Sequence, residues 1–566
     1  MCGIAGYVGG GDLRRMLECI SHRGPDRTGV WEGENVALGC NRLAVIDIEG
    51  GRQPLFDENG GLIVYNGEIF NFPEIRKELE KKQPFKTKSD TEVILRAYRE
   101  WGAECLSKFN GMFAFAIWDG EKLFMARDRM GEKPFYYHNG PDGFFFASEI
   151  KAILSQVEGR VRFTPEFDAF EYPCGEDTYY ENIKALEPGC YLEYVRGDLK
   201  KKRYWSIPVG ERMRERSDRE YVEEFRELIE NAVAIRLRSD VPVGIFLSGG
   251  LDSAMIAALA GPMDAFSCRF PDGDVFDEWE YARIAAGNVG LTPRQVTPTF
   301  EDFRNKLPKI LWHLDGPIST MSSIGEFSLA AEAKDRVKVV LGGQGGDELL
   351  GGYVRYLLML EEARIAATEP LKNYVPLARK IWGEDFGDDP ASRYFKLICR
   401  NGRASGEAAD TVRRLFDVPG GLLDKMSFAD IHLQLPALLT MNDRAAAAYG
   451  IENRCPFLDY RIVEFAFRLP EELRIRDLRT KWILREAARG LVPDAIVDRV
   501  DKKGLVTPVG EWLAGPLKGW VKNLLGDDIA EYDTGPLGIF DHGLYHAVSL
   551  KVWETVRTSP LKPPEP

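Results

Sequence analysis

The sequence predicts two halves of different fold class, an α+β half followed by an α/β half. Up to about residue 200, many short β-like runs are separated by Gly, Pro and Asn and interrupted by few helical patterns, which is typical of packed antiparallel sheets. From about residue 218, an apolar run of strand length leads through a polar turn into a helical run, which is the unit of a parallel α/β sheet. Residues 350 to about 500 read as mostly helical, so we expect many helices around that sheet.

The elements of the first half follow from apolar runs of strand length. Strands are expected at Ile4–Val8, Val36–Leu38, Leu62–Tyr65, Phe113–Trp118, Leu123–Ala126, Phe144–Ala147 and Tyr191–Tyr194. Helical patterns occupy about 74–82 and 91–101.

The elements of the second half begin with a helix. Asp218–Arg238 carries apolar residues at spacings of three and four, which predicts one buried helical face. The elements expected next are a strand at Val241–Leu247, a turn at Ser248–Ser253, a helix at Ala254–Leu259, a strand at Val337–Leu341 and a Gly-rich turn at Gly342–Gly346.

A polar, charged stretch separates the halves. Pro208–Ser217 has the composition of a domain linker. We therefore predict a first domain at 1–205, a linker at 206–220 and a second domain at 221–566. The proline-rich tail, Thr558–Pro566, is expected to fray.

Composition excludes several classes of function. The net charge is −14, from 88 acidic and 74 basic residues, which argues against a nucleic-acid-coating or membrane-surface role. No apolar run approaches the roughly 18–20 residues that span a bilayer, and the N-terminus lacks the pattern of a signal peptide. Nine scattered cysteines without a Cys-x-x-Cys pair favour free thiols and a cytoplasmic location. Six dispersed histidines argue against a zinc site or a chymotrypsin-like triad.

Cys2 is the first candidate catalytic residue. It follows Met1, and removal of the methionine would leave a cysteine with its own free α-amine. The thiol can then attack while the amine holds the proton, so no histidine is needed. A buried cysteine of no chemical role is the alternative.

The second candidate site is the loop Ser248–Ser253, between an apolar strand and a helix. Its glycines let the backbone approach an anion, and the helix N-terminus offers unpaired N–H groups. The pattern is not a Walker loop. Asp252 suits a ligand for Mg²⁺ bound to pyrophosphate better than a contact with bare phosphate. A Gly-rich turn capped by serine is the alternative.

The first half resembles the class II glutamine amidotransferases, which are N-terminal-nucleophile hydrolases with an αββα sandwich. Five motifs match in order: Met-Cys-Gly-Ile-Ala-Gly at the start, His22–Asp26, Asn41–Asp47, Tyr65–Ile69 and Ser89–Glu92. The resemblance implies that Cys2 attacks the glutamine side-chain amide.

The same resemblance implies the glutamine-binding residues. Arg42 would hold the substrate α-carboxylate and Asp90 its α-ammonium group. The Asn66 side chain and the Gly67 N–H would form the oxyanion hole, and Glu68 could also contact glutamine. The alternative for Asn66-Gly67 is a hairpin turn. His22 is expected to be a structural hydrogen-bonding residue.

The second half resembles the ATP-pyrophosphatase, or PP-loop, enzymes, which split ATP between its α and β phosphates. Ser248-Gly249-Gly250-Leu251-Asp252-Ser253 matches their signature. Leu341–Tyr353 is similar to the second nucleotide and metal motif of asparagine synthetases, in which Asp347 would be the second Mg²⁺ ligand beside Asp252. The match continues through Arg444, Glu452–Asp459 and Lys481–Arg485, and Lys481 would neutralise phosphate charge. Besides the loop residues, the resemblance assigns Leu247, Cys268, Gly342 and Gly343 to the ATP site.

Together the motifs resemble the glutamine-hydrolysing asparagine synthetase family from residue 2 to about 510. The resemblance implies that ATP and Mg²⁺ activate a carboxylate, with aspartate the first candidate, as an acyl-adenylate, and that ammonia from glutamine displaces AMP. Its substrates would be glutamine, ATP and the carboxylate, without nucleic acid or membrane, and the assembly could be a homodimer.

Two departures leave the acceptor open. Gln344 stands where these enzymes commonly carry a glutamate, thought to act when ammonia attacks, and a glutamine cannot take a proton. The segment 315–328, expected to line the acceptor pocket, has no arginine. The alternatives are an amidotransferase for a cell-wall, sugar-linked or natural-product carboxylate, a lactam-forming cyclase, and a non-catalytic binding protein. The intact Cys2 and Asp252 argue against the last two.

Overall fold

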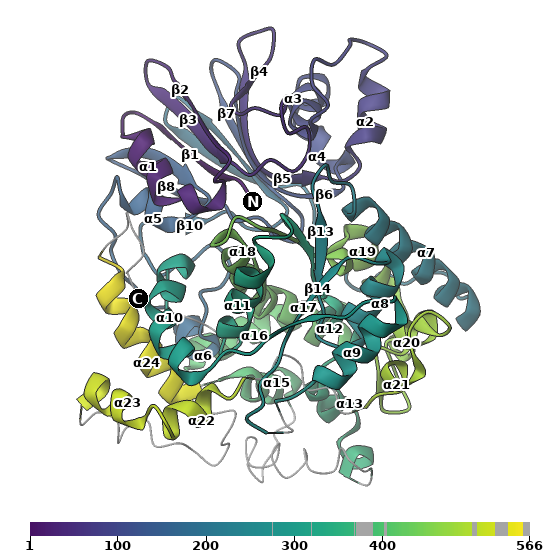
Figure 1. Ribbon diagram of the computed structural model, residues 1–566. Coiled ribbons are helices and arrows are strands. Elements are labelled where there is room, and N and C mark those ends of the chain that lie inside the picture. The colour runs from purple at the N-terminus through teal and green to yellow at the C-terminus, as the bar shows by residue number, and fades with distance from the viewer. Residues whose placement is uncertain are drawn as a thin grey trace.

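The computed structural model describes residues 1–273, 276–317, 320–366, 368, 389–400, 405–500, 507–526 and 542–558 (Figure 1). Of the predicted tail, only Thr558 lies among them. Within these residues no helix is long and apolar enough to cross a membrane.

Two sheets of six strands build the N-terminal half. The first has the order β10 (Lys184–Ala185), β8 (Tyr136–Gly140), β9 (Gly143–Ala147), β1 (Gly3–Val8), β3 (Val36–Arg42), β2 (Arg27–Glu32). The second has the order β12 (Asp198–Arg203), β11 (Cys190–Val195), β7 (Leu123–Arg127), β6 (Gly111–Trp118), β5 (Leu62–Ile69), β4 (Leu55–Phe56). The paired strands run antiparallel, as β1 and β3 or β5 and β6 do.

Helices cover both outer faces of this pair of sheets. One apolar cluster lies between the sheets and joins Ile4 and Leu38 to Val64 and Met125. The first sheet packs its other face on α1 (Leu13–Cys19) and α5 (Ile150–Leu154), and the second on α2 (Phe72–Leu79), α3 (Asp90–Trp101) and α4 (Cys105–Lys108). The layers are therefore helix, sheet, sheet, helix, which confirms the α+β sandwich.

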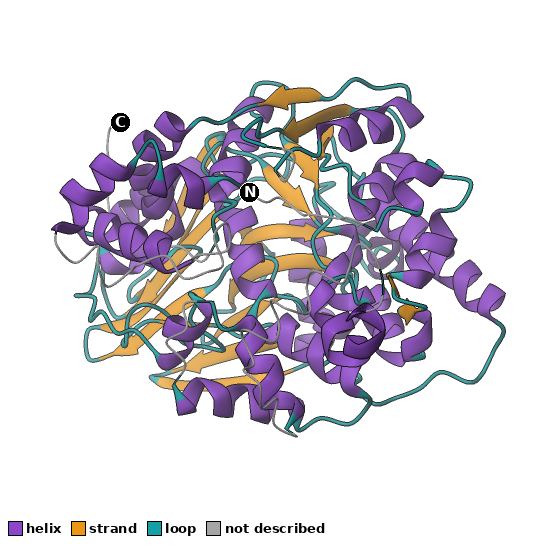
Figure 2. Ribbon diagram, turned by 90° about the horizontal axis from the view of Figure 1, so that it is seen from below, coloured by secondary structure: helices purple, strands orange, loops and turns teal. Residues whose placement is uncertain are grey.

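The C-terminal half is built on a parallel sheet of five strands. Its order is β15 (Arg294–Val296), β14 (Asp264–Cys268), β13 (Val243–Phe246), β16 (Val339–Leu341), β17 (Glu452–Arg454). Helices lie on both sides of these strands (Figure 2). This arrangement confirms the predicted α/β class.

The helices nearest this sheet are α7 (Asp218–Arg236), α8 (Leu251–Ala260), α9 (Trp279–Asn288), α10 (Phe300–Leu314), α11 (Ser323–Ala333), α12 (Gly346–Leu350) and α18 (Leu435–Ala447). Around them lie α6 (Pro165–Phe170), α13 (Val354–Ala366), α15 (Pro390–Ile398), α16 (Gly406–Phe416), α17 (Leu422–Leu433), α19 (Tyr460–Arg468), α20 (Trp482–Ala488), α21 (Asp494–Val497), α22 (Val509–Ala514), α23 (Lys518–Leu525) and α24 (His542–Val556). A short hairpin, β18 (Ile475–Arg476) and β19 (Arg479–Thr480), precedes α20. Side-chain caps begin two of the long helices, because Ser217 and Glu220 form a capping box on α7 and Thr299 and Asp302 form one on α10.

The predicted strands are all present, and several predicted helix boundaries are wrong. The helix predicted at Asp218–Arg238 ends at Arg236. The helix placed at 74–82 begins at Phe72, behind Asn71, and ends at Leu79. The helix placed at Ala254 begins at Leu251, because Gly250 has the extended conformation of an N-cap. Asp252 therefore lies in the first helical turn and not in a loop.

The two halves meet around the N-terminus, which Figure 1 places between them. Met1 is fully buried and packs against Phe266, Leu329 and Ala446 of the C-terminal half. At the edge of the contact, Lys338 Nζ lies 2.8 Å from Asp26 Oδ2. The start of the chain is thus enclosed by both halves.

Candidate functional site

Cys2 lies directly before β1 and is held by main-chain contacts. The register of β1 and β3 pairs Gly3 with Asn41, which places Cys2 beside Arg42. The Cys2 thiol lies 3.7 Å from the Leu43 carbonyl oxygen, and Arg23 Nε donates to the Cys2 carbonyl at 3.0 Å. The residue is 8% exposed and thus nearly buried.

The surroundings of Cys2 favour its thiolate form. The neighbouring Cys40 thiol lowers the pKa of Cys2 to about 7, against the opposing effect of burial. Burial raises the pKa of Cys40 itself well above its ordinary value, so that Cys40 stays a thiol. Burial also lowers the pKa of the Met1 α-amine to about 5, so this amine is a proton acceptor at neutral pH. A thiolate is the attacking form of cysteine, and a pKa near 7 leaves part of the Cys2 side chain in that form at neutral pH.

Asn66 and Gly67 lie inside β5, opposite Ala114 and Phe113 of β6, so the hairpin alternative is wrong. Both polar atoms of the Asn66 side chain are buried without a hydrogen-bond partner. Leaving a buried amide unpaired costs about 1–3 kcal/mol, so such groups call for an explanation. Gly67 has a φ of 140°, and a Cβ there would lie 2.0 Å from the Met112 carbonyl oxygen, which only glycine allows.

The other predicted glutamine-binding residues surround this point. Arg42 donates to the carbonyl oxygens of Ile46, Asp47 and Ile48 at 2.9, 2.8 and 2.7 Å, which shapes the loop after β3. Asp90, at the start of α3, accepts from the Tyr65 hydroxyl at 2.9 Å and the Ile69 N–H at 3.0 Å.

Burial dominates the titration of the two carboxylates here. It raises the pKa of Asp90 to about 6 and the pKa of Glu68 well above its ordinary value. The charges of Asp90 and Cys2 raise the pKa of Glu68 further, which places all three groups in one electrostatic environment. Glu68 Oε1 also lies 3.6 Å from the Arg454 guanidinium of the other half, so Glu68 faces both halves.

A second constellation lines a cavity of about 390 Å³ at the carboxyl end of the parallel sheet. Such sheet ends are where ligands bind in α/β folds. Predicted residues on its wall are Leu247, Ser248, Asp252, Ser253, Cys268, Gly342, Gly343, Gln344 and Asp347. Gly249 and Gly250 belong to the same loop but lie behind the wall. Gly249 has a φ of 78°, and a Cβ there would lie 2.4 Å from the Ala282 nitrogen of α9.

Two carboxylates and a lysine converge at one end of this cavity. Lys481 Nζ lies 2.7 and 2.6 Å from the two carboxylate oxygens of Asp252 and 2.7 Å from Asp347 Oδ1. The carboxylates come from different helices, Asp252 from α8 and Asp347 from α12, and reach the same ammonium group. Carboxylate oxygens are the protein donors that Mg²⁺ prefers, and Mg²⁺ usually takes one or two of them together with phosphate oxygens and water. Asp252 and Asp347 therefore fit a magnesium ion bound to pyrophosphate.

Two further buried carboxylates line the cavity and escaped the sequence analysis. Burial raises the pKa of both Glu326 and Glu348 to about 7. Glu348 accepts from the Tyr353 hydroxyl at 2.6 Å, and Glu326 lies on α11. The sequence signal for Glu326 was a single acidic residue between Ile324 and Phe327, in an otherwise apolar helical run.

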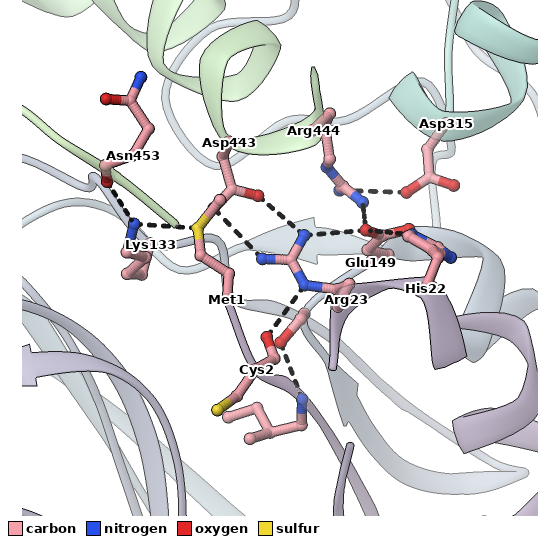
Figure 3. A network of polar contacts seen from close by, with 12 residues as sticks. Met1, Cys2, His22, Arg23, Lys133, Glu149, Asp315, Asp443, Arg444 and Asn453 are labelled. Atoms are coloured by element: carbon pink, nitrogen blue, oxygen red, sulfur yellow. Dashed lines mark hydrogen bonds and ion pairs between the residues drawn. The ribbon is translucent and has the colours of Figure 1, made fainter. Parts of the chain in front are cut away.

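Buried ion pairs join the two constellations (Figure 3). Arg23 Nη1 lies 2.8 Å from Glu149 Oε1 of its own half and 2.8 Å from Asp443 Oδ2 of the other. Arg444 of the C-terminal half reaches back to Glu149 at 2.8 Å, and its other nitrogen lies 3.1 Å from Asp315. The Cys2 carbonyl is therefore braced through Arg23 against α18.

His22 adds to this network as a hydrogen-bonding residue, with Nε2 3.1 Å from Glu149 Oε1. Burial lowers the pKa of His22, so the ring is neutral at pH 7. The expectation of a structural role for His22 is confirmed.

Comparison with known proteins agrees with these two sites. Residues 1–205 match a family model described as a glutamine amidotransferase domain, and residues 224–551 match one described as asparagine synthase. Asparagine synthetase [glutamine-hydrolyzing] 1 of Bacillus subtilis is 33% identical over 91% of this chain and 86% of its own. Asparagine synthetase [glutamine-hydrolyzing] 3 of that organism is 32% identical over 93% and 90%, and Amidase chry2 of Gibberella zeae is 27% identical over 91% and 87%. The chain therefore belongs to the family of glutamine-hydrolysing asparagine synthetases, which are ATP-dependent ligases.

Proposed function

We propose that this enzyme takes ammonia from glutamine at Cys2 and uses it to amidate a carboxylate, L-aspartate being the first candidate, in the cavity of the C-terminal half. The proposal rests on one observation, the presence of two chemically distinct sites in the same chain. The first has the Asn66 amide without a hydrogen-bond partner and the Cys2 thiol with its lowered pKa. The second has two carboxylates, Asp252 and Asp347, that both pair with Lys481. Residues 1–205 would form the glutaminase domain, 206–220 the linker and 221–566 the synthetase domain.

In the glutaminase reaction, the Cys2 thiolate attacks the side-chain amide carbon of glutamine. The Asn66 Nδ2 and the Gly67 N–H donate to the developing oxyanion, which explains why Asn66 has no partner within the protein. Arg42 holds the α-carboxylate and Asp90 the α-ammonium group. Ammonia leaves, and water then hydrolyses the thioester to release glutamate.

Removal of Met1 completes this site. It transfers the free α-amine from Met1 to Cys2, where the amine can accept the thiol proton directly. The buried environment that lowers the pKa of the present α-amine supports a neutral amine at that position.

In the synthetase reaction, the acceptor carboxylate attacks the α-phosphorus of ATP and pyrophosphate leaves. Asp252 and Asp347 would hold Mg²⁺, which neutralises charge on the leaving pyrophosphate. Lys481 contributes a second positive charge at the same point, and Ser248, Ser253 and the N-terminus of α8 offer donors to phosphate. Leu247, Cys268 and Gly343 would frame the nucleoside.

An ammonia route between the two sites would pass a wall that they share. Phe266 and Leu329 contact the buried Met1 on one side and line the synthetase cavity on the other. Removal of Met1 vacates a side-chain volume against this shared wall. Most ammonia is protonated in neutral water and cannot attack, so a buried route keeps it reactive.

The acceptor pocket favours a second candidate acceptor, a carboxylate other than aspartate. The described residues that line the cavity include no arginine, and the lysine at its end, Lys481, is already paired with Asp252 and Asp347. Three other lining residues, Glu278, Glu326 and Glu348, are acidic. The α-carboxylate of aspartate calls for a cation, which these lining residues do not offer. An acceptor that carries an amino group and no second carboxylate suits the described wall better.

An acceptor screen tests the proposal. The full-length enzyme is incubated with ATP, glutamine, Mg²⁺ and single carboxylates, starting with L-aspartate, and AMP and amide products are read by mass. Acceptor-dependent AMP with one amide formed per AMP supports the proposal. If glutamate is formed but no carboxylate in the panel yields AMP, the synthetase assignment is contradicted.

A further inference from the structure

Glu326 is a buried carboxylate to which the reaction described above assigns no role. It lies on α11, is 8% exposed, and forms part of the wall of the synthetase cavity together with Gln344. Burial is the largest cause of its raised pKa, about 7, and the Asn442 amide opposes it. A carboxyl with a pKa near 7 can take up or release a proton at working pH.

Two side-chain amides, those of Asn442 and Asn453, lie near Glu326 and Gln344. The Asn442 Oδ1 accepts from Asn453 Nδ2 at 3.0 Å, so Asn442 Nδ2 is the group available to Glu326. At the other end, Asn453 and Gln344 both abut Gly342, where a Cβ would lie 2.9 Å from Asn453 Oδ1 and 2.3 Å from Gln344 Oε1. The neutral Gln344 and the ionisable Glu326 thus share one corner of the cavity.

Glu326 also faces the side from which ammonia would enter. Leu329 follows it by three residues on α11, so the two side chains lie on one face, about one helical turn apart. Leu329 packs against Met1 and also lines the cavity. On the side of Met1 that Figure 3 shows, Lys133 Nζ lies between Met1 Sδ, at 3.0 Å, and the Asn453 carbonyl oxygen, at 3.3 Å.

Other titratable groups in the cavity or near it are less suited to receive a proton from ammonia. Glu278 on the cavity wall is ion-paired with Arg499 at 2.6 Å. Cys268 of β14 and Cys455 after β17 have pKa values raised by burial, and the Glu326 charge adds to both. Glu348 and Asp347 lie on α12 beside the phosphate site, and Glu348 is already hydrogen-bonded to Tyr353. Gln344 has no titratable group.

We propose that Glu326 is the catalytic base of the amide-forming step, in place of the carboxylate that Gln344 does not supply. The inference rests on the proposed function. Ammonia forms the new C–N bond to the acyl-adenylate carbonyl carbon. The attacking nitrogen gives one proton to the Glu326 carboxylate, the C–O bond to AMP breaks, and AMP leaves with the electron pair. The net products are the amide, AMP and one proton.

The test compares four variants with the full-length enzyme, using L-aspartate or whichever carboxylate the acceptor screen identifies. One of them, Glu348→Gln, removes another buried carboxylate of the cavity. Glu326→Gln removes the base while keeping the side-chain shape. Glu332→Gln is the matched control, because Glu332 is an exposed glutamate on the same helix. Glu326→Gln/Gln344→Glu returns one carboxylate to the same corner of the cavity. Circular dichroism melting curves establish that each variant is folded.

Three rates separate the steps: glutaminase activity, acceptor-dependent ATP–pyrophosphate exchange, and amide formation from ammonium chloride. General base catalysis contributes about 10²–10⁴-fold, so Glu326→Gln should lower amide formation by at least about 100-fold. Exchange and glutaminase activity should change by less than about threefold, since neither step needs the base. The double variant should recover at least about tenfold, and Glu332→Gln should match the parent.

The pH dependence of amide formation is a further measurement, and a purely structural role of Glu326 would not affect it. At constant concentration of unprotonated ammonia, amide formation by the parent should fall as pH drops below about 7, because Glu326 becomes protonated. Glu326→Gln should lose that dependence. The inference would be overturned if Glu326→Gln formed amide at the parent rate, or if its ATP–pyrophosphate exchange fell as much as its amide formation. It would also be overturned if Glu348→Gln, rather than Glu326→Gln, lost the pH dependence. If the parent shows no exchange with any carboxylate, the proposed function fails, and this inference fails with it.

Discussion

At the scale of single residues, the first site is defined by an amide without a hydrogen-bond partner and by a thiol with a lowered pKa. The amide is that of Asn66, and two fully buried polar atoms without hydrogen bonds are a feature that stability alone does not explain. The thiol is that of Cys2, which lies against the Leu43 carbonyl oxygen and whose pKa the Cys40 thiol lowers to about 7.

Replacing Asn66 by alanine tests its role. An oxyanion-hole donor contributes about 10²–10³-fold to kcat, so Asn66→Ala should lower glutaminase kcat by that factor. Its free energy of unfolding should change little, because no hydrogen bond is lost. Asn110→Ala is the matched control. Asn110 donates to Asp459 at 2.9 Å, so that variant should lose stability while Cys2 chemistry persists. Equal kcat in Asn66→Ala and the parent would refute the oxyanion assignment.

The pH dependence of the glutaminase tests the Cys2–Cys40 pair. Because the Cys40 thiol lowers the pKa of Cys2 to about 7, kcat/KM for glutamine should rise with pH through about 7. Cys40→Ala removes that effect and leaves burial, which raises the pKa, so the rising limb should move to higher pH. A profile that does not shift in this variant would show that Cys40 has no part in activating Cys2.

At the scale of elements, the close packing of the phosphate loop on α9 makes Gly249 essential. Gly249→Ala would set a methyl group 2.4 Å from the Ala282 nitrogen and would force the loop away from α9. Adenylation, read as ATP–pyrophosphate exchange, should fall by at least about tenfold, which corresponds to about 1.4 kcal/mol. Glutaminase activity should be retained.

Gly261→Ala is the matched control for this experiment. Gly261 ends the same helix with a φ of 77°, but a Cβ there meets no atom within 4 Å. It therefore carries similar backbone strain without a clash. Similar exchange rates in the two variants would contradict the packing argument.

Much of the element structure was predictable because it depends on local patterns. Apolar runs of strand length located the strands, and the match of ordered motifs located Cys2, Asp252 and Lys481. The features that local sequence patterns do not predict depend on tertiary contacts. The pair Asn66-Gly67 is a strong hairpin signal locally, yet pairing with β6 keeps it inside a strand. Glu326 belongs to no motif, and only the fold brings it to the cavity wall.

At the scale of the whole molecule, the halves are held by buried charges rather than by the exposed edge contacts. Arg23, Glu149, Asp443 and Arg444 are nearly or fully inaccessible, whereas the Asp26–Lys338 pair is partly exposed. Removing one partner of a buried pair costs about 3–5 kcal/mol, but an exposed pair contributes about 1 kcal/mol or less.

Asp443→Asn should therefore lower the free energy of unfolding in urea by about 3 kcal/mol. Lys338→Met, which breaks the exposed pair between the same halves, should change it by less than about 1 kcal/mol. Since Arg23 also holds the Cys2 carbonyl, Asp443→Asn should in addition lower glutaminase activity. Equal stability losses in the two variants would contradict the network's role.

The low pKa of Asp443 gives this network a pH dependence of defined sign. Arg23 holds the Asp443 carboxylate in its charged form, although burial opposes it. Its contribution to stability is therefore present above the unfolded-state pKa, roughly 4, and is lost as pH falls through the folded-state value. The difference in stability between the parent and Asp443→Asn should shrink on acidification below about pH 4, as urea denaturation at several pH values would show.

The central claim is that one chain holds two separable reactions, and Cys2→Ala tests it most directly. The measurement is amide formation by this variant with glutamine and, separately, with ammonium chloride, at saturating ATP and acceptor. The two-site account predicts loss of the glutamine-dependent rate and retention of the ammonium-dependent rate within about twofold of the parent, because the synthetase cavity keeps its carboxylates and Lys481. Loss of both rates in a folded Cys2→Ala protein, or retention of the glutamine-dependent rate, would contradict it.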